Sequence, residues 1–250
     1  YFIYTRLSKF QLPMDSHNLK LLYPWLLFDA DDTLFDYQAA EAHALQVVFA
    51  HFQIPFLPNY AQVYANINHH YWQKFEAGTI SLVELRNVRF HDLLEELNLP
   101  PDADLFSRVY LTKLGQCVQL LPGVLETLTI LAASHHLALI TNGLSSVQRS
   151  RLSLSPIGRF FNHVFISEEI GVSKPAAGFF DHVFSHIGQP ARSEVLVIGD
   201  SLSSDITGGA AYGLDTCWFN PHRHPNTLSI QPTYEVQALN ALIAICGSNS

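Results

Sequence analysis

The sequence predicts an α/β fold in which a parallel β-sheet is covered by helices on both faces. Short, continuous apolar runs alternate along the chain with stretches whose apolar residues recur at helical spacing. Such runs are typical of strands that are buried on both faces of a parallel sheet. With 48% apolar and 14% charged residues in 250, the composition supports one large domain or a core domain with an insertion.

Five strands are expected, each from one apolar run. In chain order, the runs are 25–28, 137–140, 163–166, 195–198 and 216–219. Four of them lead directly into polar or turn residues, which begin at Asp29, Thr141, Gly199 and Asn220. Because ligands of open parallel sheets bind outside the carboxyl ends of the strands, we expect the chemistry of the protein at these positions.

Helices are expected between these strands. Apolar residues at helical spacing occur over 124–131 and over 179–187. A third helix begins near Ser203 or Ser204 and ends at Gly213, since serine favours helix starts and glycine favours helix ends. This alternation of strands and helices predicts a sheet with helices on both faces.

The interval 37–115 breaks the alternation, because it holds several amphipathic stretches and no convincing strand. We therefore expect a helical insertion over 37–115. The α/β core would then consist of 24–36 and 116–250.

Residues 1–23 are expected to form an N-terminal extension of this core. The only methionine is Met14, and a natural start at that residue would make residues 1–13 a non-native extension. The same segment carries no sustained apolar stretch after its basic residues, so it does not resemble a signal peptide.

Charge and cysteine content narrow the expected partners and compartment. The net charge is −8, and no run of Lys and Arg forms a basic patch, so a nucleic acid polymer is not an expected partner. No apolar stretch reaches the roughly 18 residues of a membrane-spanning helix. Three cysteines without a CxxC pair favour a reducing cytoplasm over a disulfide framework. The oligomeric state stays open between monomer and homodimer.

The first polar cluster runs from Asp29 to Thr33 and follows the first strand. Asp29 and Asp31 are two residues apart, and a tight turn could bring both carboxylates to one site. One carboxylate could then attack phosphorus while the other handles the proton. The alternative is a solvated, carboxylate-rich turn.

Two further clusters supply groups that suit phosphate oxygens. Thr141, Asn142 and Gly143 offer a hydroxyl, an amide and backbone N–H donors, although a simple strand-end turn has the same residues. Lys174 is a point cation suited to phosphate, and Pro175 favours an extended backbone before it. An exposed, solvated lysine is the alternative.

The fourth cluster consists of Asp200, after the fourth expected strand, and Asp205 five residues later. A carboxylate pair at the end of a strand suits Mg²⁺, which prefers oxygen ligands and usually keeps several waters. The alternative is an acid in a turn together with an acid that interacts with the dipole of a helix start.

The order of the four clusters resembles the haloacid dehalogenase superfamily of phosphohydrolases. Its pattern is DxDx[TV], a Ser or Thr at a strand end, a Lys, and an acidic GD…D motif, and each part is present here between residues 24 and 220. The resemblance implies a Rossmann-like, doubly wound parallel sheet with an inserted α-helical cap. It also implies a phosphatase that requires Mg²⁺ and acts on a small-molecule phosphate ester.

The resemblance assigns roles to the acidic residues. Asp29 is implied to be the nucleophile and a Mg²⁺ ligand. Asp31 is implied to be the general acid and base, with its backbone carbonyl also on the metal. Asp200 is implied to be a metal ligand, Asp205 to support the metal or the lysine, and Thr33 to steady the turn. We expect Asp31 to be protonated when substrate binds, because other carboxylates lie near it.

The remaining motif residues are implied to bind phosphate. Thr141 and Lys174 would hold the transferring phosphoryl group, together with backbone amides near Asn142 and Gly143. The acid at Asp31 separates phosphatases from dehalogenases, because a departing halide needs no proton.

Two runs, 28–36 and 166–175, are similar to the bacterial pyrimidine 5'-nucleotidases of the house-cleaning type, and 76–90 resembles their cap. This favours a nucleoside 5'-monophosphate as substrate. Phosphoglycolate or a sugar phosphate is the alternative substrate, and a phosphomutase is the alternative enzyme. Outside enzymes, a catalytically silent binding module remains as a hypothesis.

Seven aromatic or basic residues of the cap could line a pocket for a base or a sugar. The alternative is that most of them form the cap's own core: Tyr64, Tyr71, Trp72, Phe75, Arg86, Arg89 and Phe90. Asp32 and Asp36 are expected to shape the turn or approach the cap. The histidine groups lack a zinc spacing and are expected at the surface or in the cap: 69–70, 135–136, 222 and 224.

Overall fold

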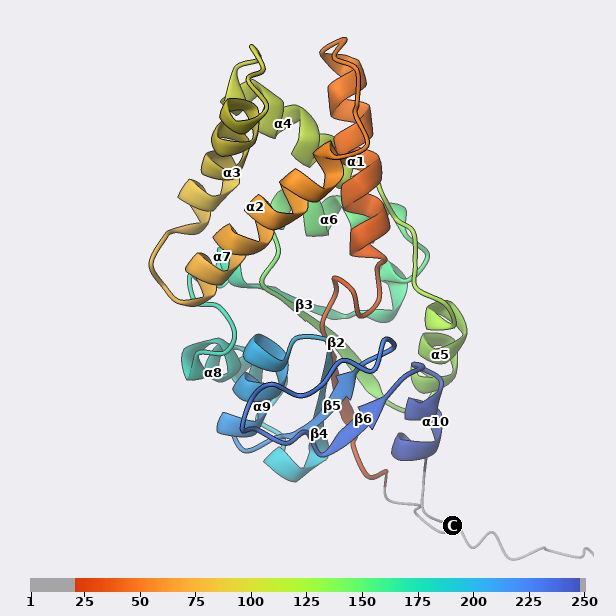
Figure 1. Cartoon of the computed structure of the whole chain (residues 1–250). Helices are drawn as coiled ribbons and strands as arrows, with labels where there is room; N and C mark the ends of the chain where they lie inside the picture. The colour runs from red at the N-terminus through yellow and green to blue at the C-terminus, as the bar shows by residue number, and fades with distance from the viewer. Residues whose placement is uncertain (1–20, 248–250) are drawn as a thin grey trace, which may run out of the picture.

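The computed structural model describes residues 21–247, which form an α/β core with a group of helices on one side of it (Figure 1). Of the expected N-terminal extension, residues 1–20 lie outside the described range, and with them the segment 1–13. Tyr23 lies within the described range. It is buried and donates a hydrogen bond to Asp215 at 2.8 Å. This tyrosine therefore packs with the sheet.

The core contains one six-stranded sheet whose paired strands are all parallel. Its strands are β1 (Trp25–Phe28), β2 (His136–Thr141), β3 (His163–Ile166), β4 (Val195–Gly199), β5 (Asp215–Phe219) and β6 (Tyr234–Val236). The order β3-β2-β1-β4-β5-β6 reverses direction beside β1, which is the switch point of a doubly wound sheet. The five expected strands are confirmed, while β6 was missed because its three residues show no apolar run.

Helices cover both faces of the sheet, as expected. On one face, Leu26 and Phe28 pack with apolar residues of α5 (Val124–Leu131) and α10 (Ala241–Cys246). On the other, Leu27 packs with the phenylalanines of α8 (Ala177–His186). The remaining core helices are α6 (Ser145–Leu154), η1 (Gly158–Phe160), α7 (Ser167–Ile170), η2 (Arg192–Glu194), η3 (Leu202–Ile206) and α9 (Thr207–Ala211).

A helical cap is inserted between β1 and β2. It consists of α1 (Tyr37–His51), α2 (Tyr60–Glu76), α3 (Leu82–Glu96) and α4 (Ala103–Leu114). Side chains stop three of these helices from fraying at their starts: Asp36, Ser81 and Asp102 accept hydrogen bonds from backbone N–H groups of the first turn. α4 packs against both α1 and α3, and α3 packs against α2 around an apolar core of their own.

Two linkers join the cap to the sheet: the first linker (residues 33–36) and the second linker (residues 115–121). They run side by side, because Leu121 N–H donates to the carbonyl of Leu34 at 2.9 Å and Asp36 N–H donates to that of Gln119 at 3.0 Å. α6 of the core also packs against α4 and contributes side chains to the cap's apolar core. The cap therefore contacts the core at its linkers and along α6.

No helix within residues 21–247 is long and apolar enough to cross a membrane. The three cysteines are all free thiols; Cys217 and Cys246 are buried and Cys117 is half-buried. Among the paired histidines, His135 is buried, with its ring nitrogens near the backbone oxygens of Leu131 and Cys246, which is a structural role.

Candidate active site

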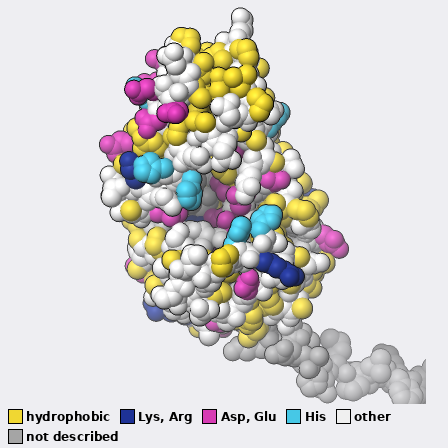
Figure 2. Space-filling view, in the orientation of Figure 1, with side chains coloured by type: hydrophobic (Ala, Val, Ile, Leu, Met, Phe, Trp, Pro, Cys, Tyr) yellow, Lys and Arg dark blue, Asp and Glu magenta, His cyan; other side chains and the backbone are white. Residues whose placement is uncertain are grey.

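A cavity of about 230 Å³ lies at the carboxyl ends of β1, β2 and β4, between the core and the cap. This is where a doubly wound sheet places its ligands. Figure 2 shows acidic side chains inside a hollow between the cap and the core. Eight of the nine residues expected in the site line this cavity: Asp29, Asp31, Thr141, Asn142, Gly143, Lys174, Asp200 and Asp205.

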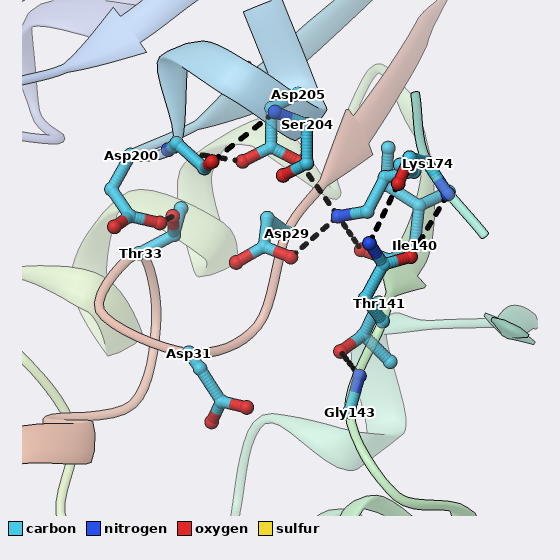
Figure 3. A network of polar contacts seen from close by, with 12 residues as sticks. Asp29, Asp31, Thr33, Ile140, Thr141, Gly143, Lys174, Asp200, Ser204 and Asp205 are labelled. Atoms are coloured by element: carbon cyan, nitrogen blue, oxygen red, sulfur yellow. Dashed lines mark hydrogen bonds and ion pairs between the residues drawn. The ribbon is translucent and has the colours of Figure 1, made fainter. Parts of the chain in front are cut away.

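Lys174 is the central cation of the site. Its Nζ donates to Asp29 Oδ1 and to Asp205 Oδ1, both at 2.6 Å, and to the carbonyl of Ile140 at 2.9 Å (Figure 3). Only 1% of its surface is exposed, so the alternative of a solvated lysine is excluded. Burial alone would lower the pKa of Lys174, but the charges of Asp205 and Asp29 outweigh burial and raise that pKa well above its ordinary value.

The loop before α8 is pinned so that Lys174 points into the site. The side-chain amide of Asn142 donates to the carbonyl of Lys174 at 2.8 Å and accepts from its N–H at 2.9 Å. Both the nitrogen and the oxygen of the Asn142 amide therefore bind the backbone of Lys174. Its observed role is to align two strand-end loops.

Three carboxylates form a cluster beside the lysine, and two of them contact it. Oxygens of Asp29, Asp200 and Asp205 lie within 4.8 Å of one another. Burial raises the pKa of Asp29 to about 7, with Lys174 opposing and Asp205 adding to the shift. Burial and the nearby charge of Asp29 also raise the pKa of Asp200 well above its ordinary value. Proton binding is favoured because burial disfavours the charged form and because ionised carboxylates repel one another.

The same cluster fits a divalent cation. With all three carboxylates ionised, they and the lysine would carry a net charge of −2, which a cation of charge +2 would balance. All the available ligand atoms are oxygens, which is the chemistry that Mg²⁺ prefers. Lys174 already occupies one oxygen of Asp205, and the N–H of Ser201 donates to the other at 3.2 Å. Both oxygens of Asp205 are therefore engaged in hydrogen bonds. Within residues 21–247, Asp29 and Asp200 each keep one oxygen free for a cation.

A tight turn after β1 arranges the first cluster. The N–H groups of Leu34 and Phe35 both donate to the carbonyl of Ala30 at 2.9 Å. Thr33 is fully buried, and its hydroxyl donates to Asp200 Oδ1 at 3.2 Å, which fixes that acid beside the turn. Asp32 has a left-handed backbone (φ 56°) and accepts from the N–H of Tyr37 at 3.1 Å. Asp32 thus shapes the turn.

The end of β2 and the loop after it bring a threonine and a glycine to the cavity. Thr141 is buried, and its Oγ1 accepts a hydrogen bond from the N–H of Gly143 at 3.0 Å. A Cβ at Gly143 would collide with the side chain of Gln148, so only glycine permits this packing. A Cβ at Gly199 would likewise collide with the carboxylate of Asp205.

Asp31 is held differently from the other acids. Its carboxylate accepts hydrogen bonds from Arg151 Nη1 and from Gln148 Nε2, the latter at 2.6 Å. In Figure 3 its side chain points away from the pair formed by Lys174 and Asp29. Neither partner was predicted from the sequence, and both lie on α6. The protonation of Asp31 in the substrate complex stays a prediction.

The cap closes the cavity with three side chains: Tyr37, Trp72 and Glu76. Glu76 also reaches the core, where its carboxylate accepts from the hydroxyl of Ser203 at 2.9 Å. On the other side, Arg86 forms an ion pair with Glu168 at 2.5 Å. Both contacts join the cap to the core.

Most of the aromatic and basic cap residues weighed from sequence serve the cap's own structure. Tyr64 and Phe90 are buried and stacked, with ring centroids 5.3 Å apart. Arg89 is buried and donates to Asn68 Oδ1 at 2.6 Å. Of the seven candidates, only Trp72 lines the cavity, and its half-buried ring can stack on a flat group.

Asn68 extends a buried polar network toward Tyr37. Its side-chain amide donates to Glu41 Oε2 at 2.6 Å and lies 3.4 Å from the Tyr37 hydroxyl. Burial raises the pKa of Glu41 to about 7, although the nearby Arg89 opposes that shift. No sequence motif marked this network, because its members are single polar residues on three different helices.

These features agree with the matches to known proteins. Residues 26–219 match the profile of the haloacid dehalogenase-like hydrolase family. The chain belongs to this family.

Individual relatives cover nearly the whole chain. A HAD-hydrolase of Bacillus subtilis, YfnB, is 41% identical over 223 residues, which are 89% of this chain and 95% of that protein. The pyrimidine 5'-nucleotidase YjjG of Escherichia coli is 34% identical over 88% of this chain and 96% of that protein. The pyrimidine 5'-nucleotidase PynA of Streptococcus pneumoniae is 35% identical over 92% of this chain and 97% of that protein.

Solved structures confirm the fold. The crystal structure of B. subtilis YfnB bound to magnesium matches with a TM-score of 0.86 and 40% identity, over 90% of this chain and 99% of that one. An L-2-haloacid dehalogenase of Xanthobacter autotrophicus matches with a TM-score of 0.72 at 18% identity, over 89% and 98% of the two chains. At that identity the second match supports the fold alone.

Proposed function

We propose that this protein is a Mg²⁺-dependent phosphatase of small-molecule phosphate monoesters and that it acts through an aspartyl-phosphate on Asp29. The observation that carries the proposal is the buried cluster in which Lys174 binds Asp29 and Asp205, with Asp200 beside them at the carboxyl ends of the strands. A nucleophile, a cation and a candidate metal site thus meet in one cavity.

In the first step, a carboxylate oxygen of Asp29 attacks phosphorus and the bond from phosphorus to the leaving oxygen breaks. Lys174 donates a hydrogen bond to Asp29 Oδ1 and so orients this carboxylate in the cavity. Lys174, Thr141 and backbone N–H groups near Gly143 hold the phosphoryl oxygens and offset their charge. Asp31 gives a proton to the leaving oxygen, so that an alcohol departs.

In the second step, a water molecule attacks the phosphorus bound to Asp29. Asp31, now a carboxylate, accepts the proton of that water, and the bond between phosphorus and Asp29 breaks. Inorganic phosphate forms, and both aspartates return to their starting states. Splitting the hydrolysis this way replaces one difficult step by two easier ones.

Asp29, Asp200 and the backbone carbonyl of Asp31 would hold Mg²⁺. When bound, the ion would reduce the repulsion between these carboxylates and an anionic substrate. Asp205, with both oxygens engaged, would hold Lys174 in place.

We propose a nucleoside 5'-monophosphate, with a pyrimidine base, as the substrate. YjjG and PynA are pyrimidine 5'-nucleotidases, and each resembles this chain over nearly its whole length. The cavity is also walled by Trp72 and Tyr37, whose rings suit a flat base. The acidic Glu76 in the same wall disfavours a second phosphate group near it.

We propose the domain division 24–36 and 116–250 for the core and 37–115 for the cap, which the positions of α1 and α4 support. A cytoplasmic location is also proposed. It fits three free cysteines in a phosphatase of small metabolites.

The test is phosphate release from a panel of monoesters by the wild type and by Asp29→Asn, with Mg²⁺ and with chelator. The panel holds pyrimidine and purine monophosphates, phosphoglycolate and hexose phosphates. We expect Mg²⁺-dependent turnover that falls by roughly 10⁴-fold or more in Asp29→Asn. A best substrate other than a nucleotide would redirect the substrate proposal, and a folded wild type that hydrolyses none would refute the function.

A further inference from the structure

Arg151 of α6 lies at a junction between the active site and the two cap linkers. Its side chain is completely buried, and its Nη1 donates to the carboxylate of Asp31. Its Nε donates to the backbone carbonyl of Cys117 in the second linker at 2.9 Å. Its guanidinium carbon lies 4.7 Å from the centre of the Phe35 ring in the first linker. One side chain therefore contacts Asp31 and both linkers.

Gln148 completes the contact with Asp31. It lies three residues before Arg151, so both side chains leave the same face of α6. Its Nε2 donates to Asp31 Oδ2, while Arg151 donates to Oδ1. Both carboxylate oxygens of Asp31 thus accept a hydrogen bond from α6, which fixes the orientation of this carboxyl group.

Each of these two side chains has one further polar atom beside its contact with Asp31. Arg151 Nη2 and Gln148 Oε1 are buried and have no hydrogen-bond partner within residues 21–247. The contact with Asp31 therefore uses one nitrogen of each side chain.

We propose that Arg151 and Gln148 are positioning residues that hold Asp31 between the two chemical steps and release it when the linkers move. The inference rests on the proposed function, in which Asp31 is the acid and then the base. Arg151 transfers no proton itself: the proton passes from Asp31 to the leaving oxygen, and later from water to Asp31. Because Arg151 also binds the second linker, movement of the cap changes the contact that holds Asp31.

The test compares two phosphate monoesters by kcat/KM. A nucleoside 5'-monophosphate has an alkoxide leaving group that needs a proton, whereas the phenolate of p-nitrophenyl phosphate leaves without one. kcat/KM covers only the steps up to departure of the leaving group, so it isolates the role of Asp31 as an acid. The variants are Arg151→Gln and Gln148→Met, each alone and combined with Asp31→Asn.

We expect each single variant to lower kcat/KM for the nucleotide about tenfold more than for the aryl ester, since general acid catalysis contributes roughly 10²–10⁴-fold in total. When combined with Asp31→Asn, neither variant should lower kcat/KM for the nucleotide further, because both act through Asp31. Inorganic phosphate with Mg²⁺ should raise the Tm of the wild type and of the variants equally, which shows an intact phosphate site.

Gln148→Met keeps the side-chain volume and removes no contact with the linkers. If Arg151→Gln does not fold, Gln148→Met alone therefore tests the proposal. Equal losses on both esters, or losses that multiply in the Asp31→Asn background, would overturn the inference and leave the proposed function standing. A wild type that hydrolyses neither ester overturns both.

Discussion

The core wall and the cap wall of the cavity are built in different ways. On the core wall, charged side chains are buried and bind one another: Lys174 contacts two aspartates at 2.6 Å, and Asp205 is fully buried. On the cap wall, Trp72 is half-buried and Glu76 is exposed, with one hydrogen bond to the core. A rigid, charged wall suits the chemistry shared by all substrates, whereas a sparsely bonded wall suits their selection.

The largest effect is expected from Lys174→Met, which breaks the core wall. The variant leaves Asp29 and Asp205 buried without their cation, and breaking a buried ion pair costs about 3–5 kcal/mol. Activity should fall by roughly 10²–10³-fold or more, because charge stabilisation is lost. Thermal melts and phosphate release measure the two effects.

The matched control is Arg149→Gln, which removes a half-exposed ion pair with Glu169. Exposed pairs contribute at most about 1 kcal/mol, so this variant should melt close to the wild type. A Lys174→Met protein as stable as Arg149→Gln would show that the core wall is not held by its charges.

An intermediate effect is expected from Trp72→Ala on the cap wall. Stacking of a base on an aromatic ring is worth about 1–3 kcal/mol, so KM for a nucleotide should rise about tenfold. kcat, and the kinetics of a small monoester without a base, should change little. The control is Phe75→Leu, which alters a ring packed edge-on against Trp72 that does not line the cavity. An equal rise of KM for both substrates would contradict a base-binding role.

The smallest effect concerns Glu41, which lies in the cap behind the cavity. Its pKa is about 7 in the folded protein against an ordinary 4.5, so the folded state holds the proton more tightly between these pH values. The free energy of unfolding therefore decreases as the pH rises from 4.5 to 7. Glu41→Gln cannot ionise, and above pH 7 it should melt at a higher temperature than the wild type, while near pH 4.5 the two should agree.

Glu95→Gln, which changes an exposed acid of the same cap, is the control for this pH series. Melting curves at several pH values, without Mg²⁺, measure both variants. If the wild type and Glu41→Gln respond to pH identically, the buried network does not hold a proton near neutral pH.

The core wall could be predicted from the sequence because Asp29, Thr141 and Asp200 lie at the ends of apolar strands and form a known pattern with Lys174 and Asp205. The structure brings Asp29, Lys174 and Asp205 together across 145 and 31 residues of chain. Arg151 and Gln148 could not be predicted, because they lie 120 and 117 residues from Asp31 on a helix without a motif. Their role depends on which face of α6 meets the turn after β1, and a local pattern does not encode that.

The cap wall shows the same limit. Aromatic residues at helical spacing serve either a pocket or a core, and packing decides between them. Tyr64 and Phe90 became core, while Trp72 reaches the cavity. β6 was missed for a related reason: a strand of three residues at a sheet edge has one buried side chain and hence no run of apolar residues.

The pairing of the two linkers bears on how the cap can change during evolution. The chain leaves the core at Asp36 and returns to it at Gln119, and the backbone N–H of Asp36 donates to the carbonyl of Gln119 at 3.0 Å. Whatever lies between them begins and ends at the same point in space, so its length and shape place no strain on β1 or β2. A gene can therefore exchange this segment for another whose ends meet, and acquire a new specificity while it inherits the old reaction unchanged.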